Sequence, residues 1–139
     1  FTPRHVRELL DLPAEQLRNW RRHLPAIGRE RSGQAVFDFA DLLALAVMQR
    51  LVNDVGIRIG TLEPLADQLV EVCRFLDLDI AALERLEIDF DGCAVAIKRL
   101  DTPMAQSLVL ALPLGPIVKS LLGGLTTMQD GHGTLPLFR

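Results

Sequence analysis

The amino-acid sequence predicts an α+β fold that is mainly α-helical, in which a helical N-terminal part precedes a small C-terminal module of a β-hairpin, a strand and a helix. Apolar residues recur every three or four positions through most of residues 1–76, which is the period of amphipathic helices. Between residues 86 and 97 they alternate with polar residues, which is the period of a half-buried strand. The 139 residues are 49% hydrophobic and 24% charged, values typical of a folded globular chain.

The first two predicted helices have the layout of a helix-turn-helix. Thr2 followed by Pro3 is a typical helix start, and Asp11, which tolerates the left-handed turn conformation, follows the first apolar stripe. A second helix follows Pro13, with its apolar side chains facing inward at Leu17, Trp20 and Leu24. Its outward positions carry three arginines and an asparagine: Arg18, Asn19, Arg21 and Arg22. Two short helices joined by a tight turn, the second basic on its outer face, are typical of a DNA-binding unit.

Residues 25–76 are expected to form a loop or short hairpin and then two helices. Residues 25–37 combine glycines with Arg29 and Arg31 and end in a short apolar stretch. Asp38 is placed to cap a helix that Gly56 ends, and Thr61 is the expected N-cap of a further helix reaching about Leu76.

The C-terminal module is predicted from strand alternation around Asp91-Gly92. If these two residues form a type I′ turn, the facing pairs are 90–93, 88–95 and 86–97, and all of them are apolar. Residues 107–112 are expected to add a buried third strand. A short helix should follow from Gly115-Pro116 to Gly123-Gly124, and residues 126–139 are expected to be a loose tail.

Charge is divided unevenly along the chain. The 15 Lys+Arg and 18 Asp+Glu residues give a net charge of −3, so the whole chain is not a polycation. Residues 1–60 nevertheless carry a net charge of +2 and residues 61–139 a net charge of −5. This asymmetry favours a nucleic-acid-facing N-terminal part joined to a part that does not touch nucleic acid.

Several short segments of residues 1–62 occur in a specific order and spacing: Phe1-Thr2, Leu17-Arg18-Asn19-Trp20, Arg29 to Gly33, Phe37, Asp41-Leu42, and Gly56 through Thr61-Leu62. Together they resemble the DNA-binding domain of the MerR (mercury-resistance regulator) family of bacterial transcription factors. The resemblance covers a little under half of the chain. It implies a winged helix-turn-helix, with the recognition helix after Pro13 and the wing around Arg29 to Gly33.

The chain departs from the family pattern at several positions. Pro13 stands where the family usually has a serine cap, Asn19 replaces the first of two aromatic residues, and Arg21 replaces an acidic residue. Gly33-Gln34-Ala35 replaces the family's Gly-Tyr-Arg, so the arginine that grips phosphate from the wing is absent here. The wing contact therefore shifts to Arg29 and Arg31.

The candidate DNA-contact residues are seven polar side chains of the N-terminal part: Arg4, Arg18, Asn19, Arg21, Arg22, Arg29 and Arg31. Arginine can bind guanine through two hydrogen bonds, and asparagine can bind adenine in the same way. The alternative for the helix is a merely solvated basic face, and the alternative for Arg29 and Arg31 is a solvated loop. Trp20 shares its spacing with Leu17 and Leu24, which favours core packing over stacking on a base.

Catalytic and metal-binding motifs are not found in the sequence, which contains no nucleophile elbow, phosphate-binding glycine loop or paired-carboxylate motif. We therefore expect no enzyme activity, no cofactor and no metal. Cys73 and Cys93 lie on apolar faces and are expected to be buried hydrophobic residues. His5, His23 and His132 are expected at the surface, and the acidic run from Asp77 to Asp91 is expected to form a solvated face.

The leading hypothesis is a bacterial or phage transcription regulator that binds duplex DNA as a homodimer in the cytoplasm, with RNA polymerase as a further candidate partner. In this hypothesis residues 1–61 bind DNA, and residues 62–125 form a connecting helix and a small dimerisation or effector module. The alternative is a phage or plasmid DNA-architectural or adaptor protein, excisionase-like or recognising packaging sites, that uses the same helix-turn-helix. A third hypothesis is a protein-interaction domain whose arginines pair with an acidic partner. No segment is long and apolar enough to predict a membrane span.

Overall fold

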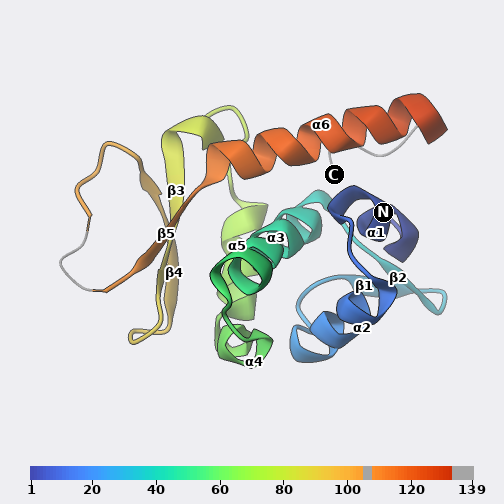
Figure 1. Cartoon of the computed structure of the whole chain (residues 1–139), viewed down its shortest axis with the longest axis horizontal. Coiled ribbons are helices and arrows are strands. Elements are labelled where there is room, and N and C mark those ends of the chain that lie inside the picture. The colour runs from blue at the N-terminus through green and yellow to red at the C-terminus, as the bar shows by residue number, and fades with distance from the viewer. Residues whose placement is uncertain (105–107, 133–139) are drawn as a thin grey trace.

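The structure is a computed structural model that describes residues 1–104 and 108–132. The N-terminal part consists of three helices and a two-stranded hairpin: α1 (Pro3–Leu10), α2 (Ala14–His23), β1 (Arg29–Arg31), β2 (Gln34–Val36) and α3 (Phe39–Gln49). The rest contains three helices and three strands: α4 (Ile59–Leu62), α5 (Ala66–Arg74), β3 (Glu84–Asp89), β4 (Ala94–Arg99), β5 (Leu110–Pro113) and α6 (Leu114–His132). The fold is thus mainly helical, with two small antiparallel sheets at opposite ends of the molecule (Figure 1).

The turn between α1 and α2 forms where the sequence predicts it. The Thr2 hydroxyl accepts a hydrogen bond from the backbone N–H of His5 (3.4 Å), and the His5 ring nitrogen Nδ1 accepts one from the N–H of Thr2 (3.1 Å). Asp11 ends α1 in the left-handed conformation, with φ 51° and ψ 50°. Helix α2 then begins after Pro13, which caps it without a side-chain hydrogen bond.

Helix α3 begins at a reciprocal cap. The Asp38 carboxylate accepts from the N–H of Asp41 (2.8 Å), and the Asp41 carboxylate accepts from the N–H of Asp38 (2.9 Å). A π-helical turn, Arg50–Val55, extends the helix to Gly56, which adopts φ 87° and ends it as predicted. The prediction that Thr61 caps the next helix is wrong. Thr61 lies inside the short α4, and α5 begins only at Ala66, after a 3₁₀ turn that contains a proline.

The three-stranded sheet has the order β4-β3-β5. Its register places Leu86 opposite Ile97 and Ile88 opposite Val95, which are two of the three predicted pairs. The predicted type I′ turn is wrong, because Gly92 has no positive φ and residues 90–93 form the loop, with Cys93 at φ 51°. The Asp89 carboxylate accepts a hydrogen bond from the N–H of Gly92 (2.9 Å), which stabilises this longer turn.

The third strand is shorter than predicted and pairs with β3. It begins at Leu110, opposite Ile88, and runs to Pro113. Residue 107, where the predicted strand begins, lies outside the described residues.

Helix α6 is longer than the sequence predicts. It starts at Leu114 and continues through Gly123-Gly124, where the helix was expected to end, to His132. The expected loose tail is therefore helical as far as residue 132, and residues 133–139 lie outside the described part of the chain. Tertiary packing explains the difference: a Cβ added at Gly124 would lie 2.5 Å from Cδ1 of Leu9, so the glycine allows α6 to approach α1 closely.

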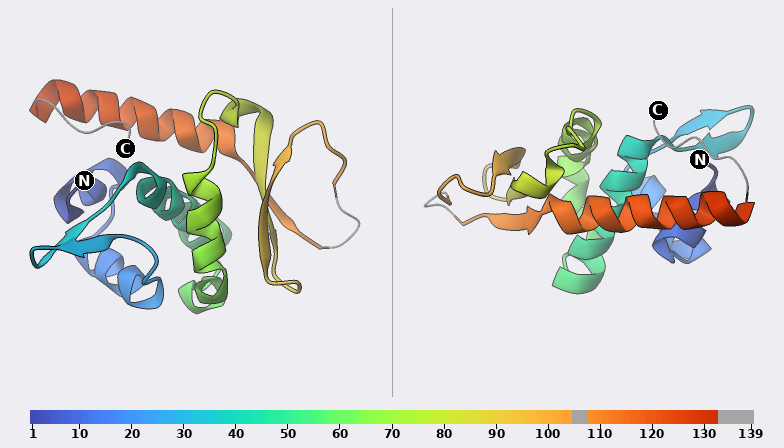
Figure 2. Two further views of the ribbon diagram at one scale, coloured as in Figure 1. Left: turned by 180° about the vertical axis from the view of Figure 1, so that it is seen from behind. Right: turned by 90° about the horizontal axis from the view of Figure 1, so that it is seen from above.

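Helix α3 lies at the centre of the molecule and is buried along most of its length. Its residues from Phe39 to Met48 are all buried, and both α5 and α6 pack against it. Helix α6 runs along one side of the molecule from the sheet to α1 (Figures 1 and 2). One hydrophobic cluster therefore includes residues from both halves of the chain. Within the described ranges, no helix is long and apolar enough to cross a membrane.

Candidate nucleic-acid interface

Helix α2 is anchored through its apolar face, as the sequence predicts. Leu17, Trp20 and Leu24 are buried, and Trp20 is only 2% exposed, so it is a core residue. Arg18 and Arg22 are exposed on the other side of the helix. Asn19, half-buried between these faces, accepts a hydrogen bond at Oδ1 from Nη2 of Arg22 (3.3 Å). The helix thus presents two guanidinium groups and an amide to solvent from a backbone that the core holds in place.

Two polar contacts connect α2 to the segment between α3 and α5. Nε2 of Gln16 donates to Oδ1 of Asn53 in the π-helical turn (3.4 Å). At the other end of the helix, Nδ1 of His23 lies 3.1 Å from Oε2 of Glu63. The first contact joins residues 37 positions apart in the chain, and the second joins residues 40 positions apart. These contacts help to fix the orientation of α2. Because they join distant residues, they could not be predicted from local sequence patterns.

Arg21 differs from its neighbours in its environment. Its guanidinium lies over the ring of Phe37, with Cζ 5.5 Å from the ring centroid. Its Nε is buried and has no hydrogen-bond partner among the described residues. Arg21 therefore connects α2 to the residue that follows the β1–β2 hairpin, and it is half-buried, whereas Arg18 and Arg22 are exposed.

Phe37 is held on several sides at the base of the β1–β2 hairpin. It is 1% exposed, its N–H donates to the carbonyl of Phe1 (2.8 Å), and its carbonyl accepts from the nitrogen of Phe1 (2.8 Å). Gly28, at φ 81°, lies against the ring, and a Cβ there would be 2.9 Å from Cε1 of Phe37. The ring therefore fixes the position of the hairpin relative to α1 and α2.

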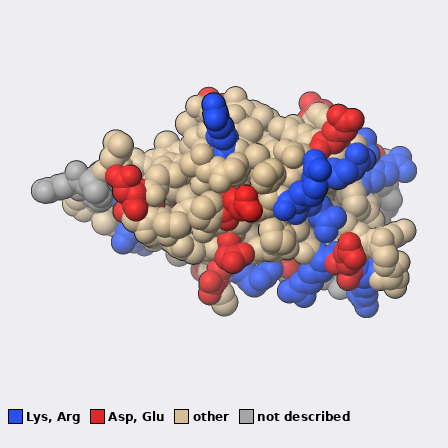
Figure 3. Space-filling view, turned by 90° about the horizontal axis from the view of Figure 1, so that it is seen from below, with Lys and Arg blue, Asp and Glu red and all other residues tan. Residues whose placement is uncertain are grey.

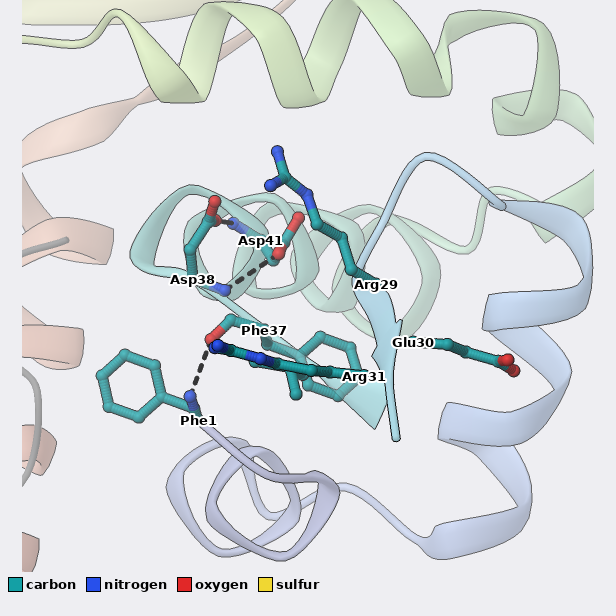
Figure 4. Close-up of a pocket in the computed structure, with 8 residues that line it drawn as sticks. Phe1, Arg29, Glu30, Arg31, Phe37, Asp38 and Asp41 are labelled. Atoms are coloured by element: carbon teal, nitrogen blue, oxygen red, sulfur yellow. Dashed lines mark hydrogen bonds between the residues drawn. The ribbon is translucent and has the colours of Figure 1, made fainter. Parts of the chain in front are cut away.

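The β1–β2 hairpin closes in a tight turn at Ser32-Gly33, where both residues have positive φ (54° and 79°). Arg29 and Arg31 are exposed and project from one face of β1, whereas Glu30 projects from the other (Figure 4). The two arginines border a cavity of about 530 Å³. Its other lining residues are Phe1, the hairpin residues Glu30 and Val36, and Phe37, Asp38 and Asp41 at or just before the beginning of α3.

Two carboxylates line this cavity, and their pKa values are shifted in opposite directions. Burial raises the pKa of Asp41 above its ordinary value, although it accepts hydrogen bonds from the N–H groups of Asp38 and Gly28. Burial acts in the same direction on Asp38, but hydrogen bonds from Asp41 and the guanidinium of Arg74 (3.2 Å) outweigh it and lower the pKa of Asp38. Two carboxylates and two guanidinium groups thus line the same cavity, and the cation paired with Asp38 is Arg74 rather than an arginine of β1.

Basic side chains gather at the end of the molecule formed by α1, α2 and the β1–β2 hairpin (Figure 3). Arg4 on α1 is exposed and makes an ion pair with Glu8 one turn later (3.1 Å). The structure thus places all seven predicted contact residues in the N-terminal part of the molecule, with Arg18 and Arg22 on the outer face of α2 and Arg29 and Arg31 on β1. Arg21 is only partly exposed, and its contact with Phe37 was not predicted.

Two predictions about other side chains need correction. Cys73 is buried, but Cys93 is exposed because the longer turn places it in the loop. Glu87 is not part of a solvated acidic face: it is buried and accepts a hydrogen bond from Nε of Arg85 (2.7 Å). Arg85 also donates to the carbonyls of Arg99 (2.8 Å) and Thr102 (2.9 Å), so the loop after β4 covers this ion pair.

The histidines and acidic residues form no metal site in the described part of the chain, which contains no group of three or more His, Cys, Asp or Glu that could hold a metal ion. His5 and His23 are half-buried rather than fully exposed, since each makes a side-chain contact described above. The side chain of His132 lies outside the described residues.

Comparison with known protein families gives a match over the N-terminal part of the chain. Residues 1–69 match a family model described as MerR HTH family regulatory protein. The matched segment begins two residues before α1 and ends within α5, so it includes α1, α2, the β1–β2 hairpin and α3. The searches of curated proteins and of solved structures returned no match.

Proposed function

We propose that this chain is a transcription regulator that binds specific sequences of duplex DNA through α2. The match of residues 1–69 to the MerR HTH family of regulatory proteins supports this proposal. The observation that carries the proposal is the two-sided environment of this helix. Its apolar side is buried at Leu17 and Trp20, while Arg18 and Arg22 on the other side face solvent. A helix held in this way can enter the major groove without losing core contacts.

Sequence readout is assigned to three side chains of α2. Arginine can bind guanine through two hydrogen bonds, so Arg18 and Arg22 are assigned to guanine, and Asn19 is assigned to adenine through its amide. The hydrogen bond between Asn19 and Arg22 restricts both side chains before DNA binds. Less conformational entropy is then lost in the complex.

The remaining arginines are assigned to the DNA backbone and to positioning. In this proposal the β1–β2 hairpin acts as a wing, from which Arg29 and Arg31 contact phosphates, and Arg4 adds a phosphate contact from α1. Arg21 contributes chiefly by stacking on Phe37, which holds α2 and the wing in a constant relative orientation.

We further propose that the regulator acts as a homodimer in a bacterial or phage-infected cytoplasm, where its DNA is found. A single module of this size buries a small DNA interface, and two modules related by a twofold axis would contact two half-sites of an inverted repeat. Contact with RNA polymerase at a promoter belongs to the same proposal.

The test compares wild type with Arg18→Ala on a duplex selected by the wild-type protein, using fluorescence anisotropy at physiological salt. If Arg18 reads a base, its loss should weaken specific binding by roughly 1–3 kcal/mol and relax the preference at one position. Arg99→Ala is the matched control, because it removes the same charge from the exposed end of β4. Equal affinity of wild type and Arg18→Ala would contradict the assignment of α2 as recognition helix.

A further inference from the structure

The exposed apolar side chains of the molecule are concentrated in its C-terminal half. Among the described residues, seven large hydrophobic side chains are exposed, and six of them follow α5: Phe75, Ile80, Leu83, Leu100, Met104 and Leu108. Phe75, at the C-terminal end of α5, is 78% exposed. Exposed apolar groups that gather on one part of a surface mark a site of interaction more often than isolated ones do.

Some of these side chains border a groove between the end of α5 and the edge strand β4. Its apolar lining comes from Val72, Phe75, Leu76 and Ile80, and from Ile97 on β4. The volume is about 480 Å³. A small molecule in the groove would leave most of Phe75 in water, whereas a macromolecular partner would cover it. We call this feature the α5–β4 groove.

The rim of the α5–β4 groove is acidic. The charged residues that line it in the described structure are Glu71, Asp77 and Glu84. Arg74, three residues from both Glu71 and Asp77, is paired with Asp38 at 3.2 Å, and Arg85, next to Glu84, is buried and paired with Glu87. Arg99, which stands opposite Glu84 in the β3–β4 register, is paired with Asp101 at 3.4 Å. Among the described residues that line the groove there are three carboxylates and no cation, so the lining itself is negatively charged.

The rim charge discriminates between possible occupants. A second copy of this chain docked through the same groove would bring acidic rim against acidic rim, because a twofold interface pairs each patch with itself. DNA and anionic lipid would be repelled for the same reason. A segment with apolar side chains flanked by Lys or Arg would complement both the lining and the rim.

We propose that the α5–β4 groove is a docking site for a basic amphipathic helix of a partner protein. Apolar side chains spaced one helical turn apart would fill the groove between Phe75 and Ile97, and basic side chains beside them would meet Glu71, Asp77 and Glu84. In Figure 1 the sheet and α2 lie at opposite ends of the molecule, so this site stays accessible when α2 contacts DNA. The inference does not depend on DNA binding.

The test uses the full 139-residue chain and two fluorescein-labelled synthetic helices of about 14 residues, each with leucine on one face. One helix carries lysine at its polar positions and the other carries glutamate. The lysine helix should bind at least about tenfold more tightly than the glutamate helix. Amide NMR shifts on the wild-type protein should be confined to residues around the groove. Absence of binding, equal affinities or shifts elsewhere would overturn the proposal.

Variants then test the rim and the lining separately. The double variant Glu71→Lys and Asp77→Lys should reverse the preference, whereas Asp91→Lys in the exposed β3–β4 loop should leave it unchanged. Phe75→Ser should weaken binding of both helices. All four positions are exposed, so their replacement should not disturb the core. If Phe75→Ser instead converts a dimer to a monomer in sedimentation, a second copy occupies the groove and the proposal is wrong.

Discussion

Arg21 is the residue whose two possible roles, phosphate contact and positioning of α2, make different predictions. Its guanidinium lies over Phe37, so Arg21→Gln should destabilise the protein by roughly 0.5–1 kcal/mol and weaken DNA binding indirectly. The slope of log affinity against log salt should stay at its wild-type value, because no phosphate contact is lost. Arg31→Gln, which removes a proposed phosphate contact, should reduce that slope by about one. A slope for Arg21→Gln that falls as much as that of Arg31→Gln would make Arg21 a phosphate contact.

The buried thiol of Cys73 makes the stability of the protein depend on alkaline pH. Burial and the charge of Asp41 raise the pKa of this thiol from 9.0 to about 12. The contribution of Cys73 to stability is fully present below pH 9.0 and is lost as pH rises toward 12, because the unfolded chain ionises first. The free energy of unfolding should fall by about 1.4 kcal/mol per pH unit in this window.

This pH dependence can be measured by urea unfolding at about pH 8 and about pH 10.5, between which Cys73 should account for a loss of about 2 kcal/mol. Cys73→Ala should remove that loss, and the exposed Cys93→Ala is the control that should keep it. The chain contains no tyrosine, so no phenol titrates in the same range. An unchanged pH dependence in Cys73→Ala would show that the thiol is not buried.

At the scale of elements, the two glycines of α6 test whether this helix is continuous. A Cβ at Gly123 meets nothing within 4 Å, so Gly123→Ala should raise the free energy of unfolding by about 1 kcal/mol through helix propensity alone. Gly124→Ala should gain less, because its Cβ would displace Leu9. Urea unfolding of the two variants measures the difference. If the helix ended here with a left-handed glycine, Gly123→Ala would instead be destabilising.

Several elements determined by neighbouring residues could be predicted from the sequence, although the Thr61 cap and the Asp91-Gly92 turn could not, and elements determined by distant contacts were missed. The caps at Thr2 and Asp38 and the left-handed Asp11 depend on local hydrogen bonds and backbone preference, and all three were predicted. The continuation of α6 past Gly124 depends on Leu9, more than a hundred residues earlier. A local helix-stop pattern carries no information about that contact.

The candidate interface shows the same distinction. Outward and inward residues of α2 follow from helical periodicity, so Arg18 and Trp20 could be placed correctly. The stacking of Arg21 on Phe37 and the buried Arg85–Glu87 pair depend on how separate segments meet. Charged residues are usually exposed, so sequence patterns alone favour solvent-exposed side chains at Arg21 and at the Arg85–Glu87 pair.

For the whole molecule, the structure shows a shared core and a division of charge. Helix α3 packs against α5 and α6, so part of the hydrophobic core of the N-terminal part is covered by helices of the C-terminal part. The division of labour at residue 61 stays a prediction. The basic side chains lie around α1, α2 and the β1–β2 hairpin, while the acidic α5–β4 groove lies beside the sheet at the other end. This separation would let one molecule contact DNA and a basic protein segment together.

The central claim, sequence-specific DNA binding through α2, is tested most directly by selecting bound duplexes from a random pool. The full chain should enrich an inverted repeat, and Arg18→Ala should lose the preference at one base of each half-site while keeping weaker, salt-sensitive binding. A pool that shows no enriched sequence after repeated selection, or one in which Arg18→Ala enriches the same sequence as wild type, would contradict the claim.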